Sequence, residues 1–182
     1  MSDTNSNYFI GGQFLTLGEN QSDTFDRFAP IYWVVKEQYE GTVLAYNIHE
    51  ENFEYVLIED SWVDEKFNDW LIIMHGIMSY PLYCFVCMPN HRLATWSEKW
   101  TVNDHLLPAE DLKLGTPLLG VRTSRQASSI NANDIQKSVT KVTEIRKINN
   151  SSRGYRIVIP NTHLLVVHDV LMAASEKRSV RS

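Results

Sequence analysis

The stretch Thr42-Val-Leu-Ala-Tyr46 and the stretch Phe53-Glu-Tyr-Val-Leu-Ile58 decide the fold class of this chain. Both are rich in β-branched and aromatic residues, and the polar segment 47–52 separates them. Two such runs on either side of a turn segment are typical of a β-hairpin. We therefore expect a pair of antiparallel strands here.

The same kind of short run recurs along most of the chain. We expect further strands at residues 8–10, 14–17, 31–35, 70–74, 80–88, 139–148, 155–159, 164–167 and 170–172. Helical periodicity is weak, and single helical turns are expected only at 109–113 and 133–137. The polar segments 19–26 and 122–133 are expected to be surface loops. Strands at this spacing indicate an all-β sandwich or barrel.

Composition fits one globular domain and argues against several kinds of partner. A chain of 182 residues with 43% hydrophobic residues can bury one core. The formal net charge of -5 argues against a nucleic-acid partner, because phosphate binding needs an excess of Lys and Arg on one face. No run approaches the roughly 18 apolar residues of a membrane span, so we expect no membrane partner.

The first seven residues are polar and lack the basic and apolar regions of a secretory signal. The two cysteines are too few for the disulfide framework of a small secreted domain. We therefore expect a protein made in the cytoplasm.

Cys84-Phe-Val-Cys87 is a C-x-x-C motif, and His91 follows four residues later. A zinc site or a redox pair is one interpretation of this pattern. Both cysteines lie in an expected strand, however, and strand residues three apart point to opposite faces. We therefore expect two buried structural thiols, no metal site and no cofactor.

Three stretches, taken in order, resemble one known family. They are Gly41-Thr-Val-Leu-Ala-Tyr-Asn47 with Phe53-Glu-Tyr-Val56, Pro89-Asn-His-Arg-Leu-Ala-Thr-Trp96 followed by 108–115, and Tyr155-Arg-Ile-Val-Ile-Pro-Asn-Thr-His163 running on to 169–172. Together they resemble the Hint (hedgehog/intein) family. The resemblance implies a Hint-like horseshoe of short strands with long polar loops, whose first and last strands lie together. It implies an N-terminal tail at 1–9, a Hint-like β domain at 10–175 and a basic tail at 176–182.

The resemblance also implies a chemistry. In this family a Cys or Ser at the first position of the domain attacks the preceding carbonyl, which requires a thiol or hydroxyl. The Thr and His of a T-x-x-H motif polarise that peptide. Inteins then use a penultimate His and a terminal Asn to release the chain, and a following Cys, Ser or Thr accepts the transferred segment.

Most of these roles fall on unsuitable residues in this chain. Gly11-Gly12-Gln13-Phe14 resembles the first motif and places Gln13 at the nucleophile position. The T-x-x-H motif reads Met88-Pro-Asn-His91, so His91 is present and the Thr is replaced by Met88. His163 matches a late-strand position that often carries His. The penultimate His and terminal Asn fall on Ala173 and Ala174, and Ser175 matches the acceptor hydroxyl. Deliberate silencing of an intein would also leave paired alanines.

These residues predict a Hint-like protein that is not an enzyme, with no catalytic residues. Because the chain begins with Met1 and has short tails, we also expect no host protein to splice. The expected role is structural or protein-binding, with protein partners in a larger assembly and no small-molecule substrate. Since Hint-like proteins occur in phage genomes, a virion component of the tail, baseplate or head decoration is one setting. The alternative is an autoprocessing protein that cleaves or splices itself.

Overall fold

The computed structural model describes residues 7–18, 28–76, 83–97, 106–122 and 132–177. Within these ranges, thirteen strands form one antiparallel sheet system, with a short α-helix and two 3-10 helices. The expected all-β class is confirmed. The strands are β1 (Phe9–Ile10), β2 (Phe14–Thr16), β3 (Phe28–Pro30), β4 (Thr42–Asn47), β5 (Asn52–Leu57), β6 (Asp60–Gly76), β7 (Tyr83–Cys87), β8 (Arg92–Ala94), β9 (Leu106–Pro108), β10 (Pro117–Arg122), β11 (Gln136–Val158), β12 (His163–Val167) and β13 (Val170–Ala173). The helices are α1 (Ile31–Lys36), η2 (Ala109–Asp111) and η3 (Ala132–Asp134).

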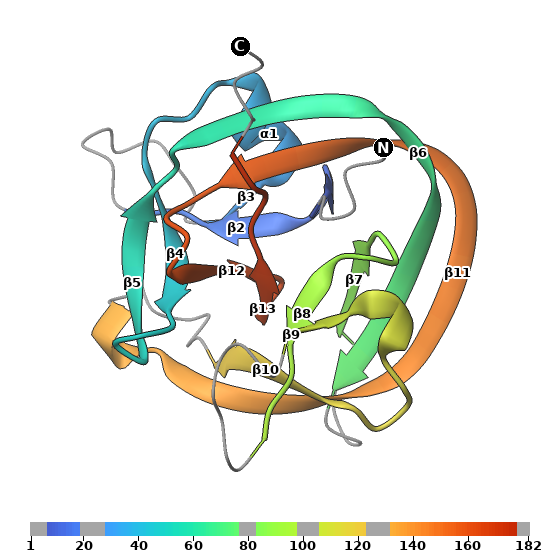
Figure 1. The fold of residues 1–182 in the computed structure, drawn as a ribbon. Coiled ribbons are helices and arrows are strands. Elements are labelled where there is room, and N and C mark those ends of the chain that lie inside the picture. The colour runs from blue at the N-terminus through green and yellow to red at the C-terminus, as the bar shows by residue number, and fades with distance from the viewer. Residues whose placement is uncertain (1–6, 19–27, 77–82, 98–105, 123–131, 178–182) are drawn as a thin grey trace.

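Strands β6 and β11 give the molecule its horseshoe shape. They pair antiparallel from Lys141 opposite Gly76 to Val158 opposite Asp60. In Figure 1 the two strands curve together around the outside, while β2, β12 and β13 cross the interior. The expected horseshoe is therefore confirmed.

The lengths of these two strands correct the expectation of short strands. The runs expected at 139–148 and 155–159 belong to one strand of 23 residues, and the run at 70–74 is part of a strand of 17 residues. The polar residues between the runs, 149–154, continue the ladder through two register shifts. Such bulges let a strand bend without ending, so a polar segment that resembles a turn stays within the strand.

Residues 31–35 form helix α1 and not the expected strand. Ile31, Val34 and Val35 are buried, which is the i, i+3, i+4 spacing of one helix face. The N–H groups of Ile31 and Tyr32, at the start of the helix, donate to the carbonyls of Gln13 and Gly11 at 2.8 and 3.0 Å. The burial of this face and these two hydrogen bonds outweigh the strand preference of β-branched and aromatic residues.

The hairpin expected at 42–58 is confirmed. β4 pairs with β5 from Thr42 opposite Leu57 to Asn47 opposite Asn52. The Asn47 carboxamide oxygen accepts the N–H groups of His49 and Glu50 at 3.0 and 3.1 Å, which closes the turn. Since β4 also pairs with β12, this hairpin is joined to the C-terminal strands.

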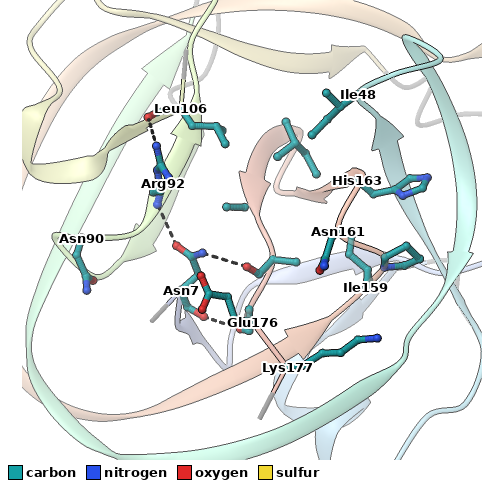
Figure 2. A pocket seen from close by; sticks show the side chains of 15 residues that line it. Asn7, Ile48, Asn90, Arg92, Leu106, Ile159, Asn161, His163, Glu176 and Lys177 are labelled. Atoms are coloured by element: carbon teal, nitrogen blue, oxygen red, sulfur yellow. Dashed lines mark hydrogen bonds between the residues drawn. The ribbon is translucent and has the colours of Figure 1, made fainter. Parts of the chain in front are cut away.

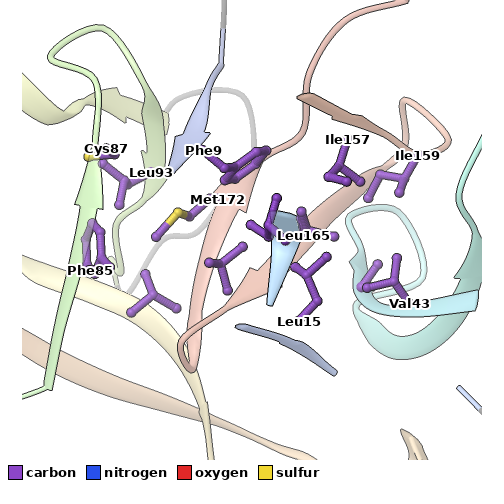
Figure 3. Close-up of a cluster of buried hydrophobic side chains, with 14 of the residues drawn as sticks. Phe9, Leu15, Val43, Phe85, Cys87, Leu93, Ile157, Ile159, Leu165 and Met172 are labelled. Atoms are coloured by element: carbon purple, nitrogen blue, oxygen red, sulfur yellow. The ribbon is translucent and has the colours of Figure 1, made fainter. Parts of the chain in front are cut away.

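The main core lies inside the horseshoe and joins both ends of the described chain. Phe9, Leu15, Leu165 and Met172 are fully buried in it, and they come from β1, β2, β12 and β13 (Figure 3). Each such side chain contributes about 1.5–3 kcal/mol through burial. Packing therefore holds the first and last strands near one another.

Other expectations fall partly outside the described residues. The loop at 19–26 and most of the loop at 122–133 lie outside them, as do residues 80–82 of the strand expected at 80–88. The helical turn expected at 109–113 is η2, and the one expected at 133–137 overlaps η3. No helix in the described ranges is long and apolar enough to cross a bilayer.

Candidate functional site

The two ends of the described chain meet at one buried junction. Residues just before β1 and just after β13 form it, and His91 lies between them. The His91 ring contacts the carbonyl oxygens of Tyr8 and Ala173, with Nδ1 at 2.9 Å from the first and Nε2 at 3.1 Å from the second. The expectation that the first and last strands lie together is confirmed.

The fold holds the imidazole of His91 in a fixed place. The His91 N–H donates to the Met88 carbonyl at 3.0 Å, which closes a turn just before β8. The ring is fully buried and packs edge-on against Phe9, with centroids 4.7 Å apart. The spacing between Met88 and His91 is that of this turn, to which Met88 contributes its backbone carbonyl.

Burial keeps His91 neutral near pH 7. Burial lowers the pKa of His91 to about 4, although the two backbone hydrogen bonds act in the opposite direction. A neutral imidazole has one N–H, so it donates to only one of the two carbonyls at a time. Protonation would satisfy both carbonyls but would place a charge in a buried site.

Ser175 completes the junction with its hydroxyl group. Its Oγ donates to the Asn7 carbonyl at 2.5 Å and accepts the Ile157 N–H at 3.3 Å. The Asn7 carboxamide adds two contacts: Nδ2 donates to the Ala174 carbonyl at 3.0 Å, and Oδ1 accepts the Arg92 N–H at 3.1 Å. The residue expected at the acceptor position thus lies directly against a backbone carbonyl.

The structure brings Tyr8, and not Gln13, to His91. Tyr8 precedes Gln13 by five residues and falls in the segment 1–9, which was expected to be an N-terminal tail. Its phenol oxygen accepts a hydrogen bond from the Arg156 guanidinium, which also lies 4.1 Å from the centre of the Tyr8 ring. His91 therefore contacts the backbone carbonyl of Tyr8, and the hydroxyl of the same tyrosine is already bound by Arg156.

Gln13 has a structural position in the turn between β1 and β2. Its Oε1 accepts the Ile10 N–H at 3.3 Å, and its backbone carbonyl accepts the N–H of Ile31. The neighbouring Gly11 leaves room for two aromatic residues, because a Cβ there would lie 2.7 Å from Cε2 of Tyr155. Packing thus accounts for Gly11 of the glycine pair, whereas a Cβ at Gly12 would meet no atom within 4 Å.

His163 lies near the junction but is bound to other groups. Its Nε2 lies 2.8 Å from Glu54 Oε1, and its Nδ1 lies 2.9 Å from the Thr162 hydroxyl. The hydrogen bonds from His163 and Asn47 lower the pKa of Glu54. Since both ring nitrogens have partners, His163 fixes the start of β12 against β5.

A pocket of about 490 Å³ opens beside the junction. Figure 2 shows Asn90 and Arg92 on one side of it and Asn161 and His163 on the other. Ala173, Ala174 and Ser175 also line it. The two alanines present only methyl groups where the family resemblance places an imidazole and a carboxamide.

The cysteines fit the expected strand geometry in part. Cys87 is buried, but Cys84 is exposed, which corrects the expectation that both thiols are buried. The two side chains point to opposite faces of β7, as alternation along a strand requires. Burial raises the pKa of the Cys87 thiol. Across the described ranges, no three His, Cys, Asp or Glu side chains are placed to hold a metal ion.

Solved structures show what this fold is similar to. The Ssp DnaB mini-intein variant M86 has a TM-score of 0.71 at 16% identity, covering 96% of this chain and 97% of its own. A DnaB intein from Synechocystis sp. PCC 6803 has a TM-score of 0.66 at 16% identity, over 94% of this chain and 100% of its own. A bacterial intein-like domain from Clostridium thermocellum has a TM-score of 0.64 at 14% identity, over 91% and 97%. No family model matches the sequence, and no curated protein matches it significantly. The chain therefore has the Hint fold, the fold of inteins and intein-like domains.

Proposed function

We propose that this chain is a non-catalytic Hint-fold protein that acts as a structural or protein-binding component of a larger assembly. The observation that carries the proposal is the chemistry of the junction. Ala173 and Ala174 have no group that could protonate a leaving amine or cyclise, and the Tyr8 hydroxyl is bound by Arg156. The junction is still buried and hydrogen-bonded although these reactive groups are missing. A stable fold without reactive groups suits a binding role.

A phage virion is the setting that we propose for this role, as a tail, baseplate or head-decoration protein. The support is the occurrence of Hint-like proteins in phage genomes, which is an analogy. The test is purification from the native source, with identification of proteins that elute with the chain. Elution with virion proteins is the expected result, and a monomer that elutes alone at every concentration would count against it.

One contact favours autoprocessing as a second candidate. The Ser175 hydroxyl lies 2.5 Å from the Asn7 carbonyl oxygen. If Ser175 Oγ attacked the Asn7 carbonyl carbon, the Asn7–Tyr8 C–N bond would break. The hydroxyl proton would pass to the Tyr8 amine, and residues 1–7 would become ester-linked to Ser175. Hydrolysis of this ester would release residues 1–7 and leave residues 8–182.

Intact mass spectrometry separates the two candidates. The freshly purified chain is held for several days at pH 7 and pH 9, with and without hydroxylamine or a thiol, and compared with Ser175→Ala. Hydroxylamine cleaves esters and thioesters, thiols cleave thioesters, and both leave ordinary peptide bonds intact. We expect the unprocessed mass in every sample. A fragment that starts at Tyr8 in the wild type and is missing in Ser175→Ala would refute the non-catalytic proposal and establish the second.

A further inference from the structure

The pocket beside the junction is lined by two polar side chains, Asn90 and Arg92, whose hydrogen-bonding groups the described residues satisfy only in part. The Asn90 side-chain oxygen is buried and accepts no hydrogen bond from the residues that the structure describes. Within the described ranges, the Arg92 guanidinium donates one hydrogen bond, to the Leu106 carbonyl at 3.3 Å, and forms no ion pair. A buried acceptor without a donor costs free energy, which rotation of the Asn90 carboxamide toward a donor on a ligand in the pocket would recover.

The backbone fixes the direction of these two side chains. Asn90 and Arg92 flank His91, whose ring points inward to the Tyr8 and Ala173 carbonyls. Asn90 and Arg92 line the pocket, and the Arg92 N–H is held by Asn7 at 3.1 Å. The contact between Asn7 and the Arg92 N–H therefore fixes the backbone that carries the Arg92 side chain.

The remaining wall is partly apolar and partly polar, with Asn161 and His163 among its polar residues. Ile48, Leu106 and Leu164 line the pocket along with Asn90 and Arg92. A volume of about 490 Å³ is in the usual range for a ligand site. A ligand that fits these walls has one anionic group for the guanidinium, a neighbouring N–H for Asn90 and apolar side chains on either side.

We propose that this pocket binds a peptide segment of a protein partner through a carboxylate held by Arg92. A guanidinium matches a carboxylate with two parallel hydrogen bonds, and a backbone N–H of the same peptide would donate to Asn90. The proposal rests on the binding role proposed above and names the chemistry of the partner. The carboxylate comes from an acidic side chain or from a chain end, and the two sources are distinguished below.

Two charged residues at the pocket predict a specific response to substitution. Lys177 is paired with Glu59 at 3.0 Å, whereas Glu176 has no ion pair with another described residue. Glu176 therefore repels an acidic peptide. Arg92→Gln should weaken the binding of such a peptide, and Glu176→Gln should strengthen it. The opposite signs are expected only if the carboxylate enters this pocket.

Three peptides test the proposal by calorimetric titration of the full chain. They are acetyl-Ala-Leu-Glu-Leu-Ala-amide, its Gln analogue as an amide, and the Gln analogue with a free C-terminal carboxylate. We expect the Glu peptide or the free-carboxylate peptide to bind at least tenfold more tightly than the neutral one, and the better of the two identifies the source. Arg92→Gln should remove that advantage, because a charged hydrogen-bonded pair contributes about tenfold or more.

The matched control is Arg153→Gln, which removes an exposed arginine on β11 that forms no ion pair in the part of the chain that the structure describes. It should bind as the wild type does, and thermal unfolding checks that every variant is folded. Asn90→Ala gives a second measurement: it should weaken peptide binding without lowering the melting temperature. Equal binding of all three peptides, no binding at millimolar peptide, or an unchanged affinity in Arg92→Gln would each overturn the proposal. Intact mass of the same samples reports separately on the non-catalytic role.

Discussion

Ser175 joins the two ends of the described chain through one hydroxyl group. Its Oγ contacts the Asn7 carbonyl and the Ile157 N–H, and the residue is 5% exposed. Water can therefore not easily replace either hydrogen bond. The same group would be the nucleophile if the chain processed itself, so its substitution measures both a structural role and a chemical one.

We predict that Ser175→Ala lowers the free energy of unfolding by about 1–3 kcal/mol, because it leaves a buried donor and a buried acceptor without a partner. Urea unfolding at pH 7 measures the change. The control is Ser151→Ala on the exposed surface of β11, which should change stability by less than about 0.5 kcal/mol. Equal stabilities of the two variants would show that the Ser175 hydrogen bonds contribute little.

The sequence predicted some junction residues and missed others. His91 and Ser175 were expected from motif spacing, and the structure places both at the junction. Asn7 and Tyr8 were not predicted, because the glycine pair Gly11-Gly12 places the family's first motif at Gln13. Nothing in the residue types around Tyr8 reveals that its carbonyl faces His91, since that contact joins residues 83 positions apart.

At the scale of elements, the local sequence pattern and the tertiary contacts of a segment can favour different secondary structures. The hairpin β4–β5 was predictable because its two strands and its turn are adjacent in sequence. The long ribbon β6–β11 was not, because the polar segment 149–154 remains in a strand only through pairing with β6. Helix α1 carried a visible signal in the spacing of Ile31, Val34 and Val35, but the β-branched composition suggested a strand.

The end of α1 yields a prediction about backbone conformation. Gln38 has a φ of 49°, and the N–H groups of Gln38 and Tyr39 donate to the carbonyls of Val35 and Val34. This is the Schellman arrangement, in which the residue with positive φ is usually glycine. A left-handed conformation costs a residue with a side chain about 1–2 kcal/mol.

We therefore predict that Gln38→Gly raises the free energy of unfolding by roughly 0.5–1 kcal/mol, after the entropy cost of glycine in the unfolded chain. Glu37→Gly is the matched control, because Glu37 is the adjacent residue and has a φ of -83°. It should lower stability by roughly 0.5–1 kcal/mol. Urea unfolding compares the two, and the same sign for both changes would refute the assignment of strain to Gln38.

At the scale of the whole molecule, two buried histidines couple folding to pH. His91 lies at the junction, and His75 lies on β6 with its Nδ1 at 3.1 Å from the Thr140 hydroxyl. Burial lowers the pKa of each to about 4, and for His75 the opposing charges of Asp169 and His168 add smaller effects. In the unfolded chain each has a pKa of about 6.5.

Between about pH 6.5 and pH 4 the unfolded chain binds more protons than the folded one, so stability falls as the pH falls. Each histidine contributes up to about 1.4 kcal/mol per pH unit in this window. We predict a marked loss of stability from pH 7 to pH 5 in urea unfolding, and about half of that loss in His75→Asn. The control His49→Asn, at the exposed tip of the β4–β5 hairpin, should keep the wild-type pH dependence. If His75→Asn also kept the wild-type pH dependence, His75 would be open to solvent protons in the folded protein. His91 alone would then have to account for the loss of stability at low pH.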